Sequence, residues 1–463
     1  MARTDGAVGG LVLRDALLAV TVLAGPLPLA SQAPAPSTYA IANVTVIPMN
    51  REGAVAGQTV VVRGDRIVEV GPSARVQVPA GSTRIDGRGK YLIPGLAEMH
   101  AHVPPGAQVS DADIERVLAL YALNGVTTIR GMLGHPRHIA FRDRANRGEL
   151  LSPRIWTSGP SFNGNSVPTP DSAARMVRAA KALGYDFLKI HPGVSRAAFD
   201  SLDAVADQVG IRFAGHVPAG VGVHRAIEAK YWTIDHIDGY LEALASGAPP
   251  TPEEAAFFGL GLAGRMDASR LPALVAAMRA AGVAIVPTSY FFEAIAGDDP
   301  VEQLAGRDDM RYIPANMLQG WTNNTNQIRQ NASRETRQIF IGARRRILKA
   351  LHDGGVVIAL GSDSPQFWNA PGFSVVRELE VYVAAGLTPW QALATGTVNV
   401  ARLLGNTAEA GTIEAGKRAD LVLLEANPLD RIGNAGRKAG VMIGGRWLDR
   451  AEIERRLAPL ALR

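Results

Sequence analysis

Apolar and polar residues alternate near both ends of the chain. Strand-like runs lie between residues 40 and 70, where a Gly64-Asp65 turn signal separates two of them, and again between residues 420 and 447. A hydrophobic period of two is typical of β-strands that are buried on one face. Because these runs flank a long middle section, we expect one small β-sandwich domain built from both chain ends, residues 34–92 and 406–463.

The middle section, residues 93–405, alternates short apolar runs with stretches in which apolar residues recur at helical spacing. The apolar runs number eight and lie at Tyr91–Leu96, Val126–Ile129, Arg154–Ser158, Phe187–Ile190, Ile211–Ala214, Trp232–Ile237, Val283–Pro287 and Val356–Leu360. Eight alternations of strand and helix favour an α/β fold of the (β/α)8 TIM barrel type over an open sheet.

One connection in this section is unusually long. Residues 288–334, after the seventh run, are polar and dotted with aromatic residues. A long connection at this position of a barrel is typical of a lid or a binding loop. We therefore expect a lid-like insertion at 288–334, with a subunit contact or a poorly ordered insertion as the alternatives.

The N-terminus has the pattern of a secretory signal peptide. Arg3 and Arg14 precede an apolar stretch at residues 16–30 that ends in small residues. The stretch is short for a membrane span and is interrupted by Gly25 and two prolines. We expect residues 1–33 to be removed and the mature protein to be periplasmic or secreted, with no membrane attachment. An uncleaved anchor and a tail from a misplaced start codon are the alternatives.

The composition narrows the chemistry. The chain has no cysteine, so disulfides and thiolate ligands are excluded and any metal must be held by nitrogen and oxygen. The 48 basic and 43 acidic residues give a net charge of only +5, and no run of Lys or Arg marks a nucleic-acid surface. We expect a small-molecule substrate, no nucleic-acid partner and a homo-oligomer.

Residues that can bind metals follow the predicted barrel strands. The first run leads into His100 and His102, and strand alternation places both imidazoles on the same side. The carboxyl ends of barrel strands carry functional side chains. The other candidates at such ends are Lys189, His216, His236 and Asp363. Because four of the nine histidines fall at predicted strand ends, we expect a metal site for Zn, Mn, Ni or Fe rather than Ca.

Lys189 lies among apolar neighbours in the fourth run. An unpaired ammonium is costly in such an interior. Lys189 either pairs with Asp363 as a structural cation, or its neutral amine reacts with CO2. The resulting carbamate would be an anionic ligand able to bridge two cations.

As a set, these motifs resemble the amidohydrolase superfamily, in particular its imidazolonepropionase-like and prolidase-like (Xaa-Pro dipeptidase-type) branch. The matching segments are Pro94–Leu96 with His100–His102, Gly125–Thr128, Phe187–Ile190, Gly215-His216, Asp235-His236, Gly361–Asp363, Ala394-Thr395 with Asn399 and Ala401, and Gly411–Ile413 with Gly416-Lys417 and Ala419–Leu421. The set covers nearly the whole chain beyond the predicted signal peptide and is specific for the superfamily but not for a substrate. One departure is Glu98, which stands where the superfamily more often has an aspartate.

The resemblance implies a binuclear centre, with zinc as the expected metal. One metal would be held by His100, His102 and Asp363, a second by His216 and His236, and carboxylated Lys189 would bridge them. Two cations would generate a bridging hydroxide near neutral pH. Asp363 would take its proton and return it to the leaving group.

The favoured activity is therefore hydrolysis of an amide-type C–N bond, as in a dipeptide, an N-acyl amino acid or a cyclic amide. Hydrolysis of a lactone or carboxylic ester by the same centre is the alternative, and a non-catalytic metal-binding barrel is a third interpretation.

Three further residues are candidates for substrate binding. His191 faces the same way as Lys189, and it either contacts the substrate or forms a supporting hydrogen bond. Arg130 is placed either to bind a carboxylate with two hydrogen bonds or to form a structural ion pair. Tyr290, at the start of the insertion, either polarises the substrate carbonyl or packs the base of the insertion.

Overall fold

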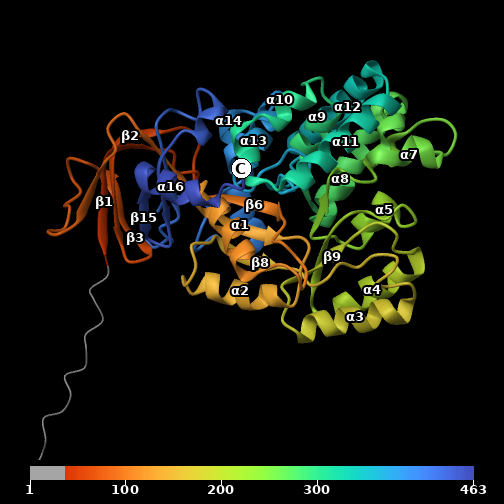
Figure 1. The fold of residues 1–463 in the computed structure, drawn as a ribbon, viewed down its shortest axis with the longest axis horizontal. Helices are drawn as coiled ribbons and strands as arrows, with labels where there is room; N and C mark the ends of the chain where they lie inside the picture. Colours follow the sequence, from red (N-terminus) through yellow and green to blue (C-terminus); the bar gives the residue numbers. More distant parts are fainter. Residues whose placement is uncertain (1–36) are drawn as a thin grey trace, which may run out of the picture. The chain divides into compact units, whose positions relative to one another are not determined.

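The structure, a computed structural model, describes residues 37–463 (Figure 1). The predicted signal peptide at residues 1–33 lies outside the described residues. None of the helices within residues 37–463 combines the length and the apolarity needed to cross a bilayer.

Strands from both chain ends pair in one mixed sheet. It consists of β1 (Thr38–Val46), β2 (Val55–Arg63), β3 (Arg66–Pro72), β4 (Thr83–Asp86), β5 (Tyr91–Pro94), β13 (Leu421–Leu424), β14 (Lys438–Ile443) and β15 (Arg446–Asp449). The order is β15-β14-β13-β5-β1-β2-β3, and β4 pairs with β1. Figure 1 shows the early strands in red beside the late strand β15 in blue. The expected contribution of both chain ends is therefore seen in the pairing, while the two-layer sandwich stays a prediction.

The first predicted barrel run divides between two sheets. Tyr91–Pro94 is β5 of the mixed sheet and pairs with β13, whereas Leu96–Ala101 is a separate strand, β6, that pairs with β7. Gly95 separates them, and a Cβ at this residue would lie 2.3 Å from the Thr127 side chain. The prediction of one strand over Tyr91–Leu96 is wrong, because the chain changes sheet at this close contact.

Two parallel sheets carry the remaining strands. The first has the order β6-β7-β8, with β7 (Val126–Gly131) and β8 (Arg154–Thr157). The second has the order β12-β11-β10-β9, with β9 (Phe187–Ile190), β10 (Arg212–Gly215), β11 (Thr233–Asp235) and β12 (Ala284–Val286). Seven of the eight predicted runs thus contain a strand, and two of these strands, β11 and β12, have only three residues each.

Isolated bridges and hydrogen bonds link these two sheets at both edges. Ser158 bridges Phe187 on one side, and on the other Ile358 bridges Ile285 while the Met99 amide donates to the Leu360 carbonyl at 2.8 Å. The eighth predicted run, Val356–Leu360, makes this bridge without forming a regular strand, so its prediction as a strand is wrong.

Helices connect the strands, as the amphipathic spacing predicts. They are α1 (Asp111–Leu123), α2 (Arg137–Asn146), α3 (Pro170–Ala182), α4 (Arg196–Val209), α5 (Gly222–Glu228), α6 (Tyr240–Leu244), α7 (Pro252–Gly259), α8 (Leu271–Ala281), α12 (Arg334–Asp353), α13 (Ser374–Ala384), α14 (Pro389–Thr395), α15 (Val398–Leu404) and α16 (Arg450–Leu457). Short 3-10 helices lie at Leu260–Arg265, Ala268–Arg270, Ile432–Gly436 and Ala458–Leu460.

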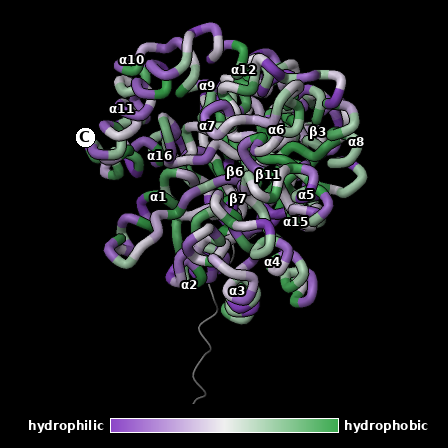
Figure 2. Tube along the Cα trace, turned by 90° about the vertical axis from the view of Figure 1, so that its right-hand side faces the viewer, coloured by the Kyte–Doolittle hydropathy of each residue, from purple (hydrophilic) through white to green (hydrophobic). Residues whose placement is uncertain are grey.

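Helix α4 illustrates why these segments are helical. Ser195 caps its first turn by accepting from the Ala198 amide, and Gly210 ends it in the left-handed conformation. Phe199 and Leu202 on one face are fully buried. Figure 2 shows hydrophobic and hydrophilic positions alternating along α3 and α4, as expected of helices with one buried face.

The insertion at 288–334 is helical. It contains α9 (Ser289–Ala296), α10 (Val301–Ala305), the 3-10 helix Asp308–Tyr312 and α11 (Ala315–Asn331). Phe292 and Ile295 of α9 are fully buried, and the Arg329 guanidinium of α11 donates to the Ile295 carbonyl at 2.8 Å. The segment is therefore helical and not a loop, and its role as a lid or as a subunit contact stays a prediction.

Candidate metal centre

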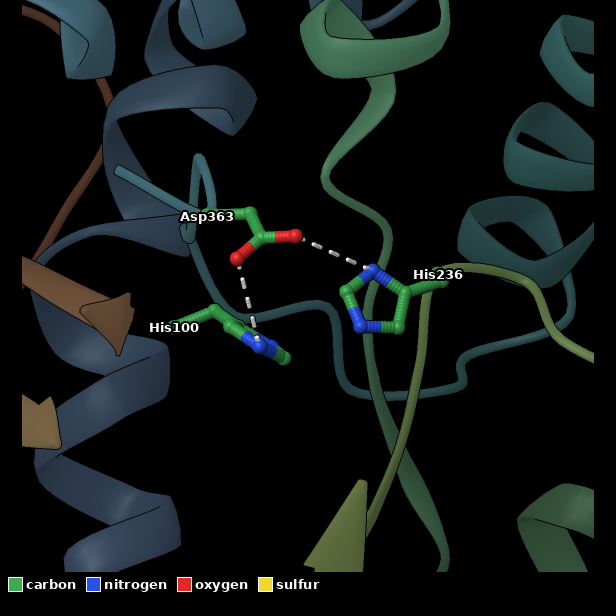
Figure 3. A group of neighbouring side chains, drawn as sticks. All are labelled: His100, His236 and Asp363. Carbon is green, nitrogen blue, oxygen red and sulfur yellow. Dashed lines mark ion pairs between the residues drawn. The ribbon is translucent and has the colours of Figure 1, made fainter. Parts of the chain in front are cut away.

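Three of the predicted ligands converge at the carboxyl ends of the parallel strands. His100 lies near the end of β6, His236 follows β11, and Asp363 follows the segment that bridges β12. Each offers one ligand atom, and these atoms all lie within 4.8 Å of one another. Figure 3 shows the Asp363 carboxylate between the two imidazoles, with Oδ1 3.6 Å from His100 Nε2 and Oδ2 3.9 Å from His236 Nδ1.

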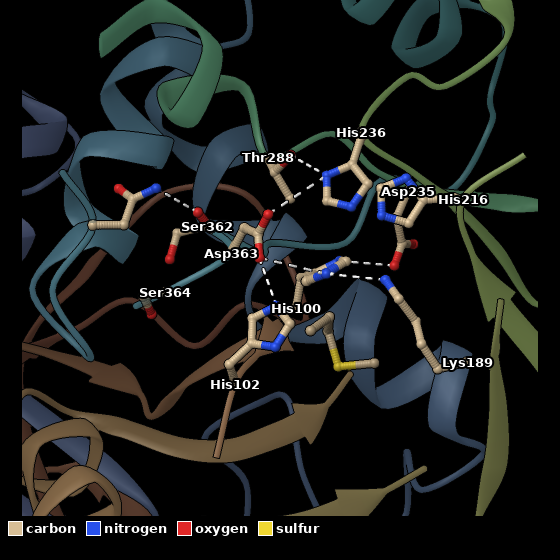
Figure 4. Close-up of polar contacts among 12 residues, drawn as sticks. His100, His102, Lys189, His216, Asp235, His236, Thr288, Ser362, Asp363 and Ser364 are labelled. Atoms are coloured by element: carbon tan, nitrogen blue, oxygen red, sulfur yellow. Dashed lines mark hydrogen bonds and ion pairs between the residues drawn. The ribbon is translucent and has the colours of Figure 1, made fainter. Parts of the chain in front are cut away.

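The other predicted ligands surround this group (Figure 4). His102 Nε2 lies 2.7 Å from Asp363 Oδ1, and Lys189 Nζ lies 3.3 Å from His100 Nε2. The ring of His216 lies 4.4 Å from that of His236, centroid to centroid. The structure thus brings all six predicted ligands together. The three residues whose ligand atoms lie within 4.8 Å of one another include predicted ligands of both metals: His100 and Asp363 of the first, and His236 of the second.

Unusual backbone conformations aim these side chains. His236 and Asp363 have φ values of 65° and 64°, and Thr288 beside His236 has 47°. Residues other than glycine rarely adopt this left-handed region, and such conformations persist at functional sites where the surroundings enforce them. The His236 amide donates to the Val286 carbonyl at 2.9 Å, which anchors the turn to the end of β12.

Residues that were not predicted from the sequence hold the imidazoles. Asp235 Oδ2 lies 2.8 Å from His100 Nδ1, Asp238 Oδ2 lies 3.0 Å from His216 Nδ1, and Thr288 Oγ1 lies 2.8 Å from His236 Nδ1. A partner on one ring nitrogen orients the ring and frees the other nitrogen for a metal. The available signal was the closeness of both aspartates to His236 in the sequence, but neither was selected as a support residue.

Glu98 connects the two segments that carry His100 and Asp363. Its Oε1 accepts from the amides of His100 at 3.1 Å and Ser362 at 2.7 Å, and its Oε2 accepts from Ser362 Oγ at 2.6 Å. The side chain is fully buried, and this burial raises the pKa of Glu98 to about 8. The departure noted in the sequence is thus a carboxylate that bridges two ligand-bearing segments.

Burial is the main cause of the pKa shifts of the lysine and of three histidines at the site. It lowers the pKa of Lys189 to about 8, although the charges of Asp235 and Asp363 oppose the shift. Burial, with the nearby Lys189 charge, lowers the pKa of His216 to about 3, and burial also places the pKa values of His100 and His236 well below the ordinary range. The imidazoles of His100, His216 and His236 are therefore neutral, which is the form that binds metal ions.

The donor set fits a divalent transition metal. His236 Nε2 and His102 Nδ1 are buried with no hydrogen-bond partner among the described residues. Buried polar atoms without partners are costly, so these nitrogens indicate either a ligand or a water that satisfies them. Several imidazoles with one carboxylate are the ligands that zinc and its neighbours prefer.

Arg130 lies beneath this group and not beside a substrate. Its side chain is fully buried and donates to the Met99 carbonyl at 2.7 Å, to Thr233 Oγ1 at 2.9 Å and to Asp235 Oδ2 at 3.2 Å. The predicted contact with a substrate carboxylate is wrong because the guanidinium is enclosed. The alternative, a structural ion pair, agrees with the contact to Asp235.

Tyr290 and His191 differ in their contacts. The Tyr290 hydroxyl contacts the Arg307 guanidinium, which favours the packing alternative over polarisation of a carbonyl. The His191 ring lies 5.2 Å from that of His216, and burial lowers the pKa of His191 to about 2. His191 therefore stays a candidate for a substrate contact.

Comparisons with known proteins agree with this architecture. The sequence model of the Amidohydrolase family matches residues 91–448. Imidazolonepropionase from Rubrobacter xylanophilus is 26% identical over 396 residues, which cover 80% of this chain and 84% of that protein.

Two solved structures share the fold. A Xaa-Pro dipeptidase with bound methionine superposes with a TM-score of 0.65 at 20% identity, over 89% of this chain and 100% of that one. Bottromycin amidohydrolase superposes with a TM-score of 0.69 at 22% identity, over 92% and 91% of the two chains. The neighbours are of the TIM-barrel class. Since the family match covers most of the sequence, the chain belongs to the amidohydrolase family and is a hydrolase that acts on carbon–nitrogen bonds.

Proposed function

We propose that the chain is an exported, metal-dependent amidohydrolase that cleaves an amide-type C–N bond in a small molecule such as a dipeptide, an N-acyl amino acid or a cyclic amide. The proposal rests on the buried group of His100, His236 and Asp363, whose ligand atoms lie within 4.8 Å of one another. Similarity to an imidazolonepropionase and to a Xaa-Pro dipeptidase supports the choice of C–N bonds.

The proposed cofactor is a pair of divalent cations, with zinc as the first metal to test. His100, His102 and Asp363 would hold one cation, and His216 and His236 the other. Such a pair, when bound, supplies an acidified water near neutral pH and polarises the scissile carbonyl.

Carboxylated Lys189 would lie between the two sets of ligands. The amine is fully buried and its nearest polar contact is His100 Nε2 at 3.3 Å, with no ion pair to a carboxylate of the described chain. Burial thus favours the neutral amine, which can form an N–C bond to CO2 with release of a proton. The product is an anion, which offsets the positive charge that a second metal would bring.

Asp363 is the proposed proton carrier. Its carboxylate lies between His100, His102 and His236, so one oxygen can accept a proton from the attacking water while the backbone holds its position. The same group would then donate that proton to the leaving nitrogen. His191 would contact the substrate from the side of His216.

The proposed architecture is a closed (β/α)8 barrel over residues 93–405 with a β-sandwich from residues 34–92 and 406–463. Contacts at both pairs of sheet edges support closure. The bridge of Ser158 to Phe187 joins one pair, and the bridge of Ile358 to Ile285, together with the hydrogen bond from the Met99 amide to the Leu360 carbonyl, joins the other. Export with removal of residues 1–33 is proposed from the sequence alone, and N-terminal sequencing of protein from the periplasmic fraction tests it.

A hydrolysis screen of the zinc-loaded mature protein tests the function. Dipeptides, N-acyl amino acids and cyclic amides would be compared with lactones and esters, with Asp363→Asn as the blank. Release of amine that depends on Asp363 supports the proposal. Cleavage of lactones or esters alone would replace it with the alternative, and no cleavage by a metal-loaded protein would contradict the substrate classes proposed.

A further inference from the structure

A cavity of about 790 Å³ opens beside His216. Its wall comes from four segments: Pro192 after β9, the turn between β10 and α5 with the first turn of α5, residues 238–243 at the start of α6, and residues 250–258 leading into and through α7. Because His216 belongs to both this wall and the candidate metal centre, the cavity adjoins the place where the scissile bond would lie.

The wall is apolar over most of its surface. Val217, Val221, Val223, Pro252 and the rings of Phe257 and Phe258 contribute to it. A cavity of this size and lining is typical of a site that encloses an organic group.

Phe258 lines the cavity and lies close to two of the predicted metal ligands. Its ring lies 5.9 Å from that of His216 and 5.7 Å from that of His236, and it packs edge-on against Phe292 at 4.8 Å. Phe257 and Phe258 interrupt α7 with φ values of 46° and 58°. Two successive residues in this rare conformation indicate that packing enforces the position of the ring.

The wall also carries acidic side chains. Asp238 and Glu242 line the cavity, and none of its lining residues, all within the described chain, is Lys or Arg. Asp238 is engaged by His216 Nδ1 and the Val217 amide. Glu242 differs from it, because its Oε2 is buried with no hydrogen-bond partner among residues 37–463.

The carboxylate of Glu242 also lacks a close cation. Arg344 acts on it only at longer range, and its Nη2 donates instead to the His236 carbonyl at 2.8 Å. Burial raises the pKa of Glu242, so its charged form is destabilised until a donor or cation arrives.

We propose that this cavity binds an apolar substrate group that bears a basic nitrogen, with Phe258 against the apolar part and Glu242 accepting from the ammonium. This assignment rests on the proposed function, since it concerns the substrate of the same centre. A substrate carboxylate on this side would meet two acidic side chains and no Lys or Arg, so substrates acidic at this end are disfavoured.

Binding of two matched probes to the metal-loaded protein tests the proposal without requiring turnover. Phenethylamine carries an ammonium at neutral pH, and 2-phenylethanol is its neutral counterpart of similar shape. Isothermal titration calorimetry should give a Kd for the amine that is lower by about ten-fold, the usual effect of a hydrogen bond between charged groups.

Three variants locate the effect. In Glu242→Gln the preference for the amine should disappear while the Kd of the alcohol stays within about two-fold, because only the charge is lost. Phe258→Ala should weaken both probes by a similar factor. Glu253→Gln is the matched control, since Glu253 lies on α7, is exposed and does not line the cavity, and it should leave both Kd values unchanged.

Equal affinities of the wild-type protein for the two probes would overturn the proposal, and so would a preference that survives in Glu242→Gln or the absence of millimolar binding of either probe. The proposed hydrolysis fails by a different result, because a protein that prefers the amine yet cleaves no amide contradicts the function and leaves the cavity assignment in place.

Discussion

The two sides of the candidate centre are held by different interactions. On the side of β6 and Asp363, buried polar groups fix the ligands through hydrogen bonds and an ion pair, as in the contacts of Glu98 with Ser362 and of Arg130 with Asp235. On the side of α5 to α7, rings and aliphatic side chains surround an open cavity, and one carboxylate has an oxygen without a partner.

This difference separates two requirements of a hydrolase. Metal ligands must be held within a fraction of an ångström, and oriented hydrogen bonds in a dry interior provide that precision. Substrate recognition requires shape and polarity, which the largely apolar wall beside His216 provides. Substitutions on the first side should therefore damage chemistry or metal content, whereas those on the second should change which substrate is preferred.

The largest effect is expected from Asp363→Asn. An amide cannot accept the proton of the attacking water, so kcat should fall by about 10³-fold or more, within the range of general acid–base catalysis. Metal analysis should show most of the metal retained, because the amide oxygen can still act as a ligand. Asp353→Asn is the control, since Asp353 is exposed and pairs with Lys349. Near-normal turnover of the Asp363 variant would refute its role in proton transfer.

The second-largest effect is expected from Lys189→Ala. Loss of the bridging carbamate should reduce the metal content from two ions to one per chain and lower kcat/KM by about 10²-fold, since support of a metal site typically affects activity on this scale. Elemental analysis after dialysis measures the first effect. Lys181→Ala, on the exposed surface of α3, should leave two ions bound. Full metal occupancy in the Lys189 variant would contradict the carbamate bridge.

Glu98→Gln should reveal how the buried Glu98 carboxyl group contributes to the pH dependence of the free energy of unfolding. Because burial raises the pKa of Glu98 from 4.5 to about 8, the folded protein binds the proton more tightly than the unfolded chain does. Between these values the free energy of unfolding of the wild-type protein should fall as pH rises, by at most about 1.4 kcal/mol per pH unit from this group. The glutamine variant should lose that part of the slope. Thermal unfolding of the two proteins across this pH interval measures the difference, and parallel slopes would contradict the assignment.

The ligands could be predicted from the sequence because strand geometry is local. Alternation places His100 in β6 and His102, which directly follows this strand, on the same side, and the ends of successive parallel strands meet at one edge. The supporting contacts could not be predicted in the same way. His216 and Asp238 are 22 residues apart, and Glu98 and Ser362 are 264 apart, so these pairs exist only once the sheets have assembled.

The errors in the fold have equally specific causes. The apolar run Tyr91–Leu96 gives no sign that the chain changes sheet, because the change depends on the close approach of Gly95 to Thr127. In the insertion, polar residues and prolines obscured the helical spacing of Phe292 and Ile295, whose burial depends on packing against distant segments. The role of Arg130 stayed open between a substrate contact and a structural ion pair, because the sequence does not show that Asp235 lies within reach of its guanidinium.

Tyr290→Phe should give the smallest effect and thereby sharpen the boundary of the centre. The Tyr290 hydroxyl contacts Arg307, its amide donates to Glu378 Oε2 at 2.7 Å, and neither contact involves a predicted metal ligand. Removing the hydroxyl costs one hydrogen bond to a charged group, about 1.5–3 kcal/mol of stability at most, because the phenyl ring still packs. The kcat of the variant should therefore stay within about three-fold of wild type, whereas removal of a group that polarises the substrate carbonyl typically lowers kcat by 10²-fold or more. A loss of that size with an unchanged melting temperature would show that the catalytic centre extends into α9. Part of the insertion would then belong with the residues whose substitution damages the chemistry.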